Sequence, residues 1–268
     1  MSTVEAYQLG HHPSVVARHA RRTAETAAAF FLPYLKPGMR VLDVGCGPGS
    51  ITAGIARRAA PGETIGIDPS PEVIETAKSY TGTTARNLKF EVGSIYEPRF
   101  AHGTFDAVFM HQVIQHLRRP VDALRQMRAL LVPNGVLGVR VVDWGSAVFY
   151  PESDGMQRYL DLHYDLARLN GTEPNAGRYL RRWFQEAGFA EARVTASIES
   201  EADPQATADR AEMFADRVLR SSIPDSALKS GIATRSDLES IAAACREWGR
   251  EPDAFFCFSH VEAVAWKR

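Results

Sequence analysis

A short apolar strand that runs directly into three closely spaced glycines constrains this chain more than any other feature. Residues 41–44 read Val-Leu-Asp-Val, and glycines follow at positions 45, 47 and 49. Glycine adopts backbone conformations closed to other residues and lets a ligand approach the main chain. The dinucleotide fingerprint G-x-G-x-x-G needs a glycine where this chain has Ser50, and the Lys-Ser/Thr ending of a P-loop is missing. The segment therefore predicts a cofactor-binding turn, the alternative being a glycine-rich turn in another kind of α/β protein.

A second apolar strand, which ends in an acid, strengthens this interpretation. Residues 64–68 read Thr-Ile-Gly-Ile-Asp, which places Asp68 about twenty residues after the glycines, the offset at which an acid binds ribose hydroxyls in dinucleotide folds. Asp68 could instead cap the next helix, but Ser70 and Pro71 already provide the cap and first-turn signals. We therefore expect Asp68 to bind a ligand.

At this point the chain resembles the class I S-adenosylmethionine-dependent methyltransferases. The likeness is close over residues 39–143 and loose on either side, and within the family it is strongest to the small-molecule methyltransferases of ubiquinone and menaquinone biosynthesis. It implies S-adenosylmethionine as the cofactor, S-adenosylhomocysteine as its product and a small molecule as the methyl acceptor. The segments that carry the resemblance, in the family's order and spacing, are residues 41–50, 66–70, 90–94, 105–108 and 131–137.

The resemblance also implies which residues face the cofactor. The glycine turn would pass the methionine portion, with Asp43 supporting the turn and the cationic amino group. Ser94 stands where the family commonly has an acid, and its hydroxyl can accept a hydrogen bond from the adenine amine. Ile95 would pack against the adenine ring or belong to the core. The expected cofactor-binding set is Asp43, Gly45, Cys46, Gly47, Asp68, Pro69, Ser94, Ile95, His111 and Gln112.

The segment after the fourth expected strand bears on the reaction. It contains His111 and Gln112 but lacks the Asn/Asp-Pro-Pro-Tyr/Phe motif with which related enzymes grip exocyclic amines of nucleic acids. His111 is the candidate catalytic residue, because imidazole titrates near neutral pH and the carboxyl end of this strand opens into the ligand crevice. A structural, hydrogen-bonded histidine is the alternative, since methyl transfer to an ionised oxygen or thiol needs no base.

Two aromatic segments are candidates for the acceptor side. The N-terminal Tyr7 and His12 would fold over the cofactor as a lid, unless they belong to a solvated terminus. Residues 144–183, expected just beyond the fifth strand, are rich in aromatic side chains and favour a flat or apolar acceptor. Met156, Tyr159, Leu160, His163 and Ala167 share one helical stripe, which is more typical of a core than of a pocket. The expected acceptor-side residues are Tyr7, His12, Tyr159, His163 and Tyr164.

Apolar periodicity predicts a single α/β domain over residues 1–268, with a Rossmann-like sheet of seven mostly parallel strands, an antiparallel last strand and helices on both faces. It divides into an N-terminal cap and helix (1–37), a cofactor-binding core (38–143) and the substrate-side helices with the final two strands (144–268). The first helix would run from Val16 to Tyr34. Strands are expected at 39–45, 64–68, 88–93, 105–110, 135–143, 192–198 and 255–266, with inserted helices near 204–222 and 234–249.

Composition limits the partners and the compartment. A net charge of −1 gives the 268-residue chain no bulk attraction to nucleic acid. The sequence shows neither a membrane-spanning run nor the pattern of a signal peptide, so we expect a cytoplasmic protein, either a monomer or a homodimer. The three cysteines, at 46, 245 and 257, have no metal-ligand spacing, and no metal is expected.

Two other functions remain open. A non-catalytic protein could bind S-adenosylmethionine or S-adenosylhomocysteine on the same fold, although an intact glycine turn together with Asp68 favours the enzyme. A nicotinamide-dependent oxidoreductase is the third possibility, and the glycine spacing argues against it.

Overall fold

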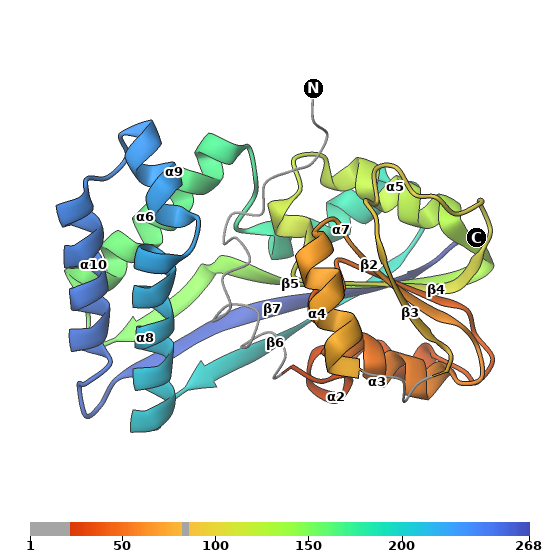
Figure 1. Ribbon diagram of the computed structural model, residues 1–268, viewed down its shortest axis with the longest axis horizontal. Helices are drawn as coiled ribbons and strands as arrows, with labels where there is room; N and C mark the ends of the chain where they lie inside the picture. Colours follow the sequence, from red (N-terminus) through yellow and green to blue (C-terminus); the bar gives the residue numbers. More distant parts are fainter. Residues whose placement is uncertain (1–21, 82–85) are drawn as a thin grey trace.

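The computed structural model describes residues 22–81 and 86–268 and shows a seven-stranded sheet in the order β3-β2-β1-β4-β5-β7-β6 (Figure 1). The Rossmann-like fold expected from the sequence is confirmed. The strand order reverses between β1 and β4, and in open α/β sheets the ligand crevice lies at such a reversal, outside the carboxyl ends of the strands. The parallel strands are β1 (Val41–Val44), β2 (Thr64–Asp68), β3 (Leu88–Val92), β4 (Phe105–His111) and β5 (Leu131–Tyr150), whereas β7 (Phe255–Trp266) runs antiparallel between β5 and β6 (Ala192–Glu201).

Helices cover both faces of the parallel part of the sheet, which explains why its central strands are apolar on both sides. On one face, α5 (Pro120–Leu130) and α7 (Ala176–Glu186) bury Leu124, Met127 and Phe184 against the strands. On the other face lie α2 (Ala24–Ala27), α3 (Ser50–Ala59) and α4 (Pro71–Thr81) (Figure 1). These helices hold the carboxyl ends of β1, β2 and β4 in fixed positions.

The fifth strand is longer than expected. The sequence predicted it over 135–143, but β5 continues to Tyr150, so residues 144–150 belong to the strand and do not follow it. A register shift between Asp143 and Val148 interrupts the pairing with β7. Ser146 bridges the two strands at this bulge, because its Oγ donates to the Asp143 carbonyl (2.6 Å) and accepts from the Ser259 amide (2.7 Å).

The extended ends of β5 and β7 carry a second group of helices. α6 (Asp154–Asn170), α8 (Pro204–Arg220), α9 (Ile223–Ser230) and α10 (Arg235–Trp248) enclose a separate hydrophobic cluster with Trp144, Phe214 and Phe256 (Figure 1). The insertion between the last two strands was expected to hold two helices. The structure adds α9, which begins after Ser221 and Ser222 and carries a proline in its first turn.

The prediction of one long helix from Val16 to Tyr34 is wrong for the part that the structure describes. From residue 22 onward, α2 ends at Ala27 and the chain turns before a short 3-10 helix, η1 (Leu32–Tyr34). Pro33 lies inside the expected helix, and proline removes a backbone donor and disfavours helical geometry at the residue before it. Phe31 instead packs into the core beside Gly138, where a β-carbon would overlap its ring.

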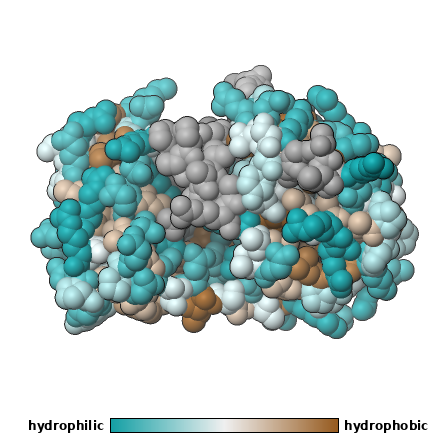
Figure 2. Space-filling view, turned by 60° about the horizontal axis from the view of Figure 1, so that its bottom comes forward, coloured by the Kyte–Doolittle hydropathy of each residue, from teal (hydrophilic) through white to brown (hydrophobic). Residues whose placement is uncertain are grey.

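One face of the molecule shows how hydrophobic side chains are distributed on the surface. Hydrophobic side chains on the face that Figure 2 shows form separate spots among hydrophilic ones, as is normal for globular proteins. Within residues 22–81 and 86–268, no helix has the length and apolar character that a membrane crossing requires.

Neighbouring phenylalanines on β7 test the second hydrophobic cluster. Phe256 is fully buried and packs edge-on against Phe214 (5.4 Å between ring centroids), whereas Phe255 is partly exposed. We expect Phe256→Ala to lower the free energy of unfolding by about 3–5 kcal/mol, because it leaves a cavity among packed rings. Phe255→Ala is the matched control and should cost less than half as much in urea denaturation. Equal losses would contradict this packing.

Candidate active site

The turn between β1 and α3 has the conformation that its glycines predict. Gly45, Gly47 and Gly49 have φ angles of +72°, +54° and +82°, in the left-handed region that side chains disfavour. The Gly45 and Cys46 amides both donate to the Ile67 carbonyl (2.7 and 3.0 Å), which holds the turn against the end of β2. A β-carbon on Gly45 would overlap Val113, whereas one on Gly47 would meet no atom within 4 Å. Gly47 therefore borders open space at the carboxyl ends of the strands.

Asp68 joins the turn to the end of β2. Its Oδ2 accepts from the Gly47 amide (3.3 Å) and its Oδ1 accepts from the Ser70 amide (3.0 Å). The capping bond to α4 comes from another residue, since Ser70 Oγ accepts from the Val73 amide (3.3 Å). Asp68 is thus not the N-cap of α4, and its carboxylate lies directly beside the open turn.

Asp43 lies beneath the same turn. Its side chain is buried in β1, and its Oδ2 accepts a hydrogen bond from Thr52 Oγ1 in α3 (2.7 Å). Burial raises the pKa of Asp43 to about 7, the Thr52 bond opposes this rise, and the nearby Asp68 adds to it. A cationic group placed here would restore the charged form of the carboxylate.

The remaining expected cofactor residues occupy varied surroundings. Cys46 is buried, and burial raises the pKa of its thiol well above the usual range, which makes it a packing residue and not a nucleophile. Pro69 is exposed beside Asp68. Ser94 follows β3, and its Oγ accepts from the Tyr96 amide (3.3 Å). Ile95 is buried in the main core, and its contact with adenine stays a prediction.

Gln112 has an unusual backbone conformation at the end of β4. Its φ is +56°, although it is not glycine, and such strain concentrates at functional sites. Its amide donates to the Arg140 carbonyl (2.8 Å), and its Oε1 accepts from the Val142 amide (3.3 Å) and from Gln115 Nε2 (2.9 Å). With the oxygen engaged twice, the side-chain amide group has a fixed orientation at the place where β4 ends and β5 continues.

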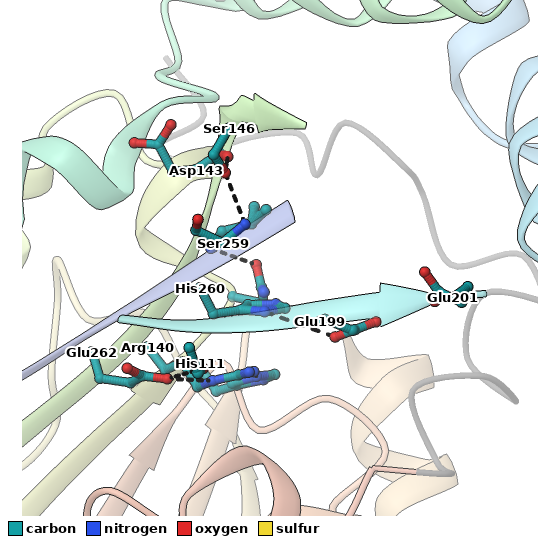
Figure 3. Close-up of polar contacts among 12 residues, drawn as sticks. His111, Arg140, Asp143, Ser146, Glu199, Glu201, Ser259, His260 and Glu262 are labelled. Carbon is teal, nitrogen blue, oxygen red and sulfur yellow. Dashed lines mark hydrogen bonds and ion pairs between the residues drawn. The ribbon is translucent and has the colours of Figure 1, made fainter. Parts of the chain in front are cut away.

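His111 belongs to a polar row that crosses the sheet. Its Nε2 lies 3.2 Å from Arg140 Nη1, and Arg140 Nε donates to Glu262 Oε1 (3.2 Å). Figure 3 shows these three side chains together, with His260 and Glu199 beside them on β7 and β6. His111, Arg140 and Glu262 are register partners on β4, β5 and β7, so strand pairing alone brings them into line.

The acceptor-side residues fall into two groups. Tyr7 and His12 lie outside the described residues. On α6, the stripe that includes Tyr159 and His163 is buried, as a core stripe would be. The Tyr159 ring packs 4.3 Å from that of Phe214, and the His163 ring lies 4.8 Å from that of Trp144. Tyr164 is half-buried and donates to Asn175 Oδ1 (2.7 Å).

Sequence reasoning missed the charged partners of the site. Arg140 interrupts an otherwise apolar strand segment, and Glu262 and His260 alternate with apolar residues on the last strand. Charges in strands that read as buried were the available signal, since such groups are rarely buried unless paired. In the described part of the chain, no group of three or more His, Cys, Asp or Glu side chains is placed so that it could hold a metal ion.

Comparisons with known proteins identify the family. A family model described as a methyltransferase domain matches residues 16–193. The chain belongs to this family and is an S-adenosylmethionine-dependent methyltransferase. It is 32% identical to a probable methyltransferase, ltbC, of Aspergillus luteorubrus, over 97% of both chains. It is also 32% identical to a ubiquinone biosynthesis O-methyltransferase of Xanthomonas campestris, over 42% of this chain and 47% of that protein. The YcgJ protein from Bacillus subtilis has a similar fold, with a TM-score of 0.58 at 16% identity, over 94% of this chain and 99% of that one.

The two glycines of the turn separate packing from ligand binding. We expect Gly47→Ala to remain folded, with a cost of about 1–2 kcal/mol for the left-handed conformation, and to bind S-adenosylhomocysteine more weakly because its methyl group enters the open space. Gly45→Ala should lose more stability, since its methyl group overlaps Val113. Thermal unfolding and calorimetry measure the two effects. Unchanged affinity in Gly47→Ala would show that no ligand lies at this turn.

The raised pKa of Asp43 predicts pH-dependent binding. Below about pH 7 this carboxyl is largely protonated, and a ligand ammonium group favours its ionised form, so binding in that range must release a proton. Affinity for S-adenosylhomocysteine should therefore rise between about pH 6 and about pH 8. Asp43→Asn, which keeps an acceptor for Thr52, should lose this dependence. Calorimetry in buffers of different ionisation enthalpy detects the proton, and a pH-independent wild type would contradict the assignment.

Proposed function

We propose that this enzyme transfers the methyl group of S-adenosylmethionine to a small-molecule acceptor by direct in-line displacement. The observation that carries the proposal is the meeting of the open Gly47 turn with the Asp68 carboxylate at the strand-order reversal. When bound, S-adenosylmethionine supplies an activated methyl group, so the protein's tasks are binding, alignment and exclusion of water.

The residues present fit this cofactor. Gly47 leaves room beside the main chain for the methionine portion. Asp68 offers a carboxylate for two vicinal hydroxyls, and Asp43 has a raised pKa that a ligand ammonium group would lower. Ser94, Ile95 and Pro69 would border the adenine, and His111 and Gln112 would border the methionine end. Cys46 would support the turn by packing.

The acceptor would lie beyond β4, between the crevice and the second group of helices. His163 and Tyr164 come from that group and would wall the acceptor, with Tyr159 behind them in the packing. Burial lowers the pKa of His163 to about 3, so this wall carries no imidazolium charge near neutral pH. Tyr7 and His12 would close the site as a lid. An uncharged, partly aromatic wall suits a flat or apolar small molecule.

The proposal also covers the partners, the compartment and the oligomeric state. A net charge of −1 supports neither nucleic-acid nor anionic-membrane partners. We infer a cytoplasmic monomer or homodimer, organised as one domain, that needs no metal.

Asp68 provides the first test. We expect Asp68→Ala to weaken binding of S-adenosylhomocysteine by about 100-fold, because two hydrogen bonds to a charged acceptor contribute about 1.5 kcal/mol each. Ser70→Ala is the matched control, since it removes the α4 cap but leaves the carboxylate. Calorimetry on both variants measures the difference, and equal affinities would refute the ribose assignment.

Turnover tests the proposed small-molecule acceptor. The purified protein is offered S-adenosylmethionine with panels of phenols, thiols and amines, and release of S-adenosylhomocysteine is measured. Release above the acceptor-free rate supports the proposal. Tight cofactor binding without release from any panel would contradict a phenol, thiol or amine as the acceptor.

A further inference from the structure

The contact between Arg140 and His111 determines which imidazole nitrogen carries the proton. A guanidinium group only donates hydrogen bonds, so His111 Nε2, 3.2 Å from Arg140 Nη1, must accept. A neutral imidazole that accepts at Nε2 carries its proton on Nδ1. Taking up a second proton would break this bond and place two cations side by side in a largely buried site.

The position of Arg140 is itself fixed. Its side chain is 12% exposed and that of Glu262 is 7% exposed, and the two form an ion pair across β5 and β7. Glu262 also accepts from Ser197 Oγ and from Thr195 Oγ1 on β6. The guanidinium therefore has little freedom to release His111, whose ring also stacks parallel to Phe109, with 4° between the ring planes.

Within residues 22–81 and 86–268, the other titratable groups near the expected acceptor are poor replacements for a base. Burial is the main cause that lowers the pKa of His116 to about 4 and those of His163 and His260 to about 3. Two nearby carboxylates are engaged in ion pairs, Glu199 with Arg210 (2.7 Å) and Asp143 with Arg178 (2.6 Å). Asp43 lies beneath the glycine turn, bonded to Thr52.

We propose that Arg140 and Glu262 are positioning residues that hold His111 in the Nδ1-protonated form, so that His111 donates a hydrogen bond and does not act as a general base. An acceptor that is methylated on oxygen or sulfur must then present that atom already ionised near neutral pH, as in an acidic phenol, an enol or a thiol, whereas a neutral amine would need no base. This statement about the acceptor rests on the proposed methyltransferase function.

The reaction balances without a base. The ionised acceptor atom uses a lone pair to form the bond to the methyl carbon. The carbon–sulfur bond of the sulfonium breaks, and its electron pair stays on sulfur, which becomes a neutral thioether. No proton leaves the acceptor in this step, so none has to be taken up by His111.

The tautomer is tested directly by NMR of the full-length, 15N-labelled protein at neutral pH. We expect the His111 signals to show a protonated Nδ1 and an unprotonated Nε2. Arg140→Met should shift them toward the Nε2-protonated form, and Arg193→Met, which removes a β6 guanidinium that lies over Trp266, should not. An Nε2-protonated or doubly protonated His111 in the wild type, or no change in Arg140→Met, would overturn the assignment.

Two additions keep this test decisive. If Arg140→Met does not fold because Glu262 is left unpaired, the double variant Arg140→Met/Glu262→Gln removes both charges and makes the same prediction. The spectra need neither cofactor nor turnover, so they test the His111 tautomer even if the proposed small-molecule acceptor is wrong.

The acceptor class is tested with substituted phenols of graded acidity. We expect the rate of S-adenosylhomocysteine release at subsaturating phenol to follow the ionised fraction of each phenol, and to rise about tenfold per pH unit below its pKa. Phenol methylation rates that do not depend on acceptor ionisation, or release with aliphatic alcohols but with no ionised oxygen or sulfur compound, would overturn this half of the inference.

Discussion

The antiparallel pairing of β5 with β7 is the interaction on which the rest of the structure depends. The pairing starts beside the parallel strands, is interrupted by a bulge that Ser146 bridges with two hydrogen bonds, and continues to Tyr150. Its first half carries the cores beneath the cofactor crevice, and its second half carries the cluster around Trp144 and Phe256. The parallel part of the sheet and the second group of helices are therefore joined by backbone hydrogen bonds and not by a flexible linker.

Backbone conformation, more than side-chain chemistry, shapes the cofactor side. Three left-handed glycines open the turn after β1, and Gln112 adopts a left-handed conformation at the end of β4. Gln112 is held there because its side-chain oxygen takes the place of a strand partner for the Val142 amide. The glycines adopt this conformation without strain, whereas the strain at Gln112 persists only where the surrounding contacts over-determine it.

A buried ion pair determines the hydrogen bonding of His111. Arg140 and Glu262 are largely buried, and removing one partner of such a pair costs about 3–5 kcal/mol because the other is left uncompensated. The pair is accordingly a fixed feature of the folded protein. Its consequence for His111 is a preference for donating a hydrogen bond, which is closer to the hydrogen-bonded histidine than to the base, the two roles that the sequence left open. His163 and His260 are also neutral imidazoles near neutral pH, because burial lowers their pKa values to about 3.

The sequence by itself determined the strands of the sheet and the cofactor turn, because these follow from local patterns: apolar strands, spaced glycines and an acid at a strand end. The order of the strands came from the tertiary structure. Pro33 was a local signal too, yet the helical periodicity around it concealed the break at Ala27. Only the tertiary structure decided the length of β5, since that depends on pairing with a strand more than a hundred residues away. It also decided the state of His111. Arg140 and Glu262 are 29 and 151 residues from it in sequence (140 − 111 and 262 − 111), and no spacing rule connects residues that meet only through strand register.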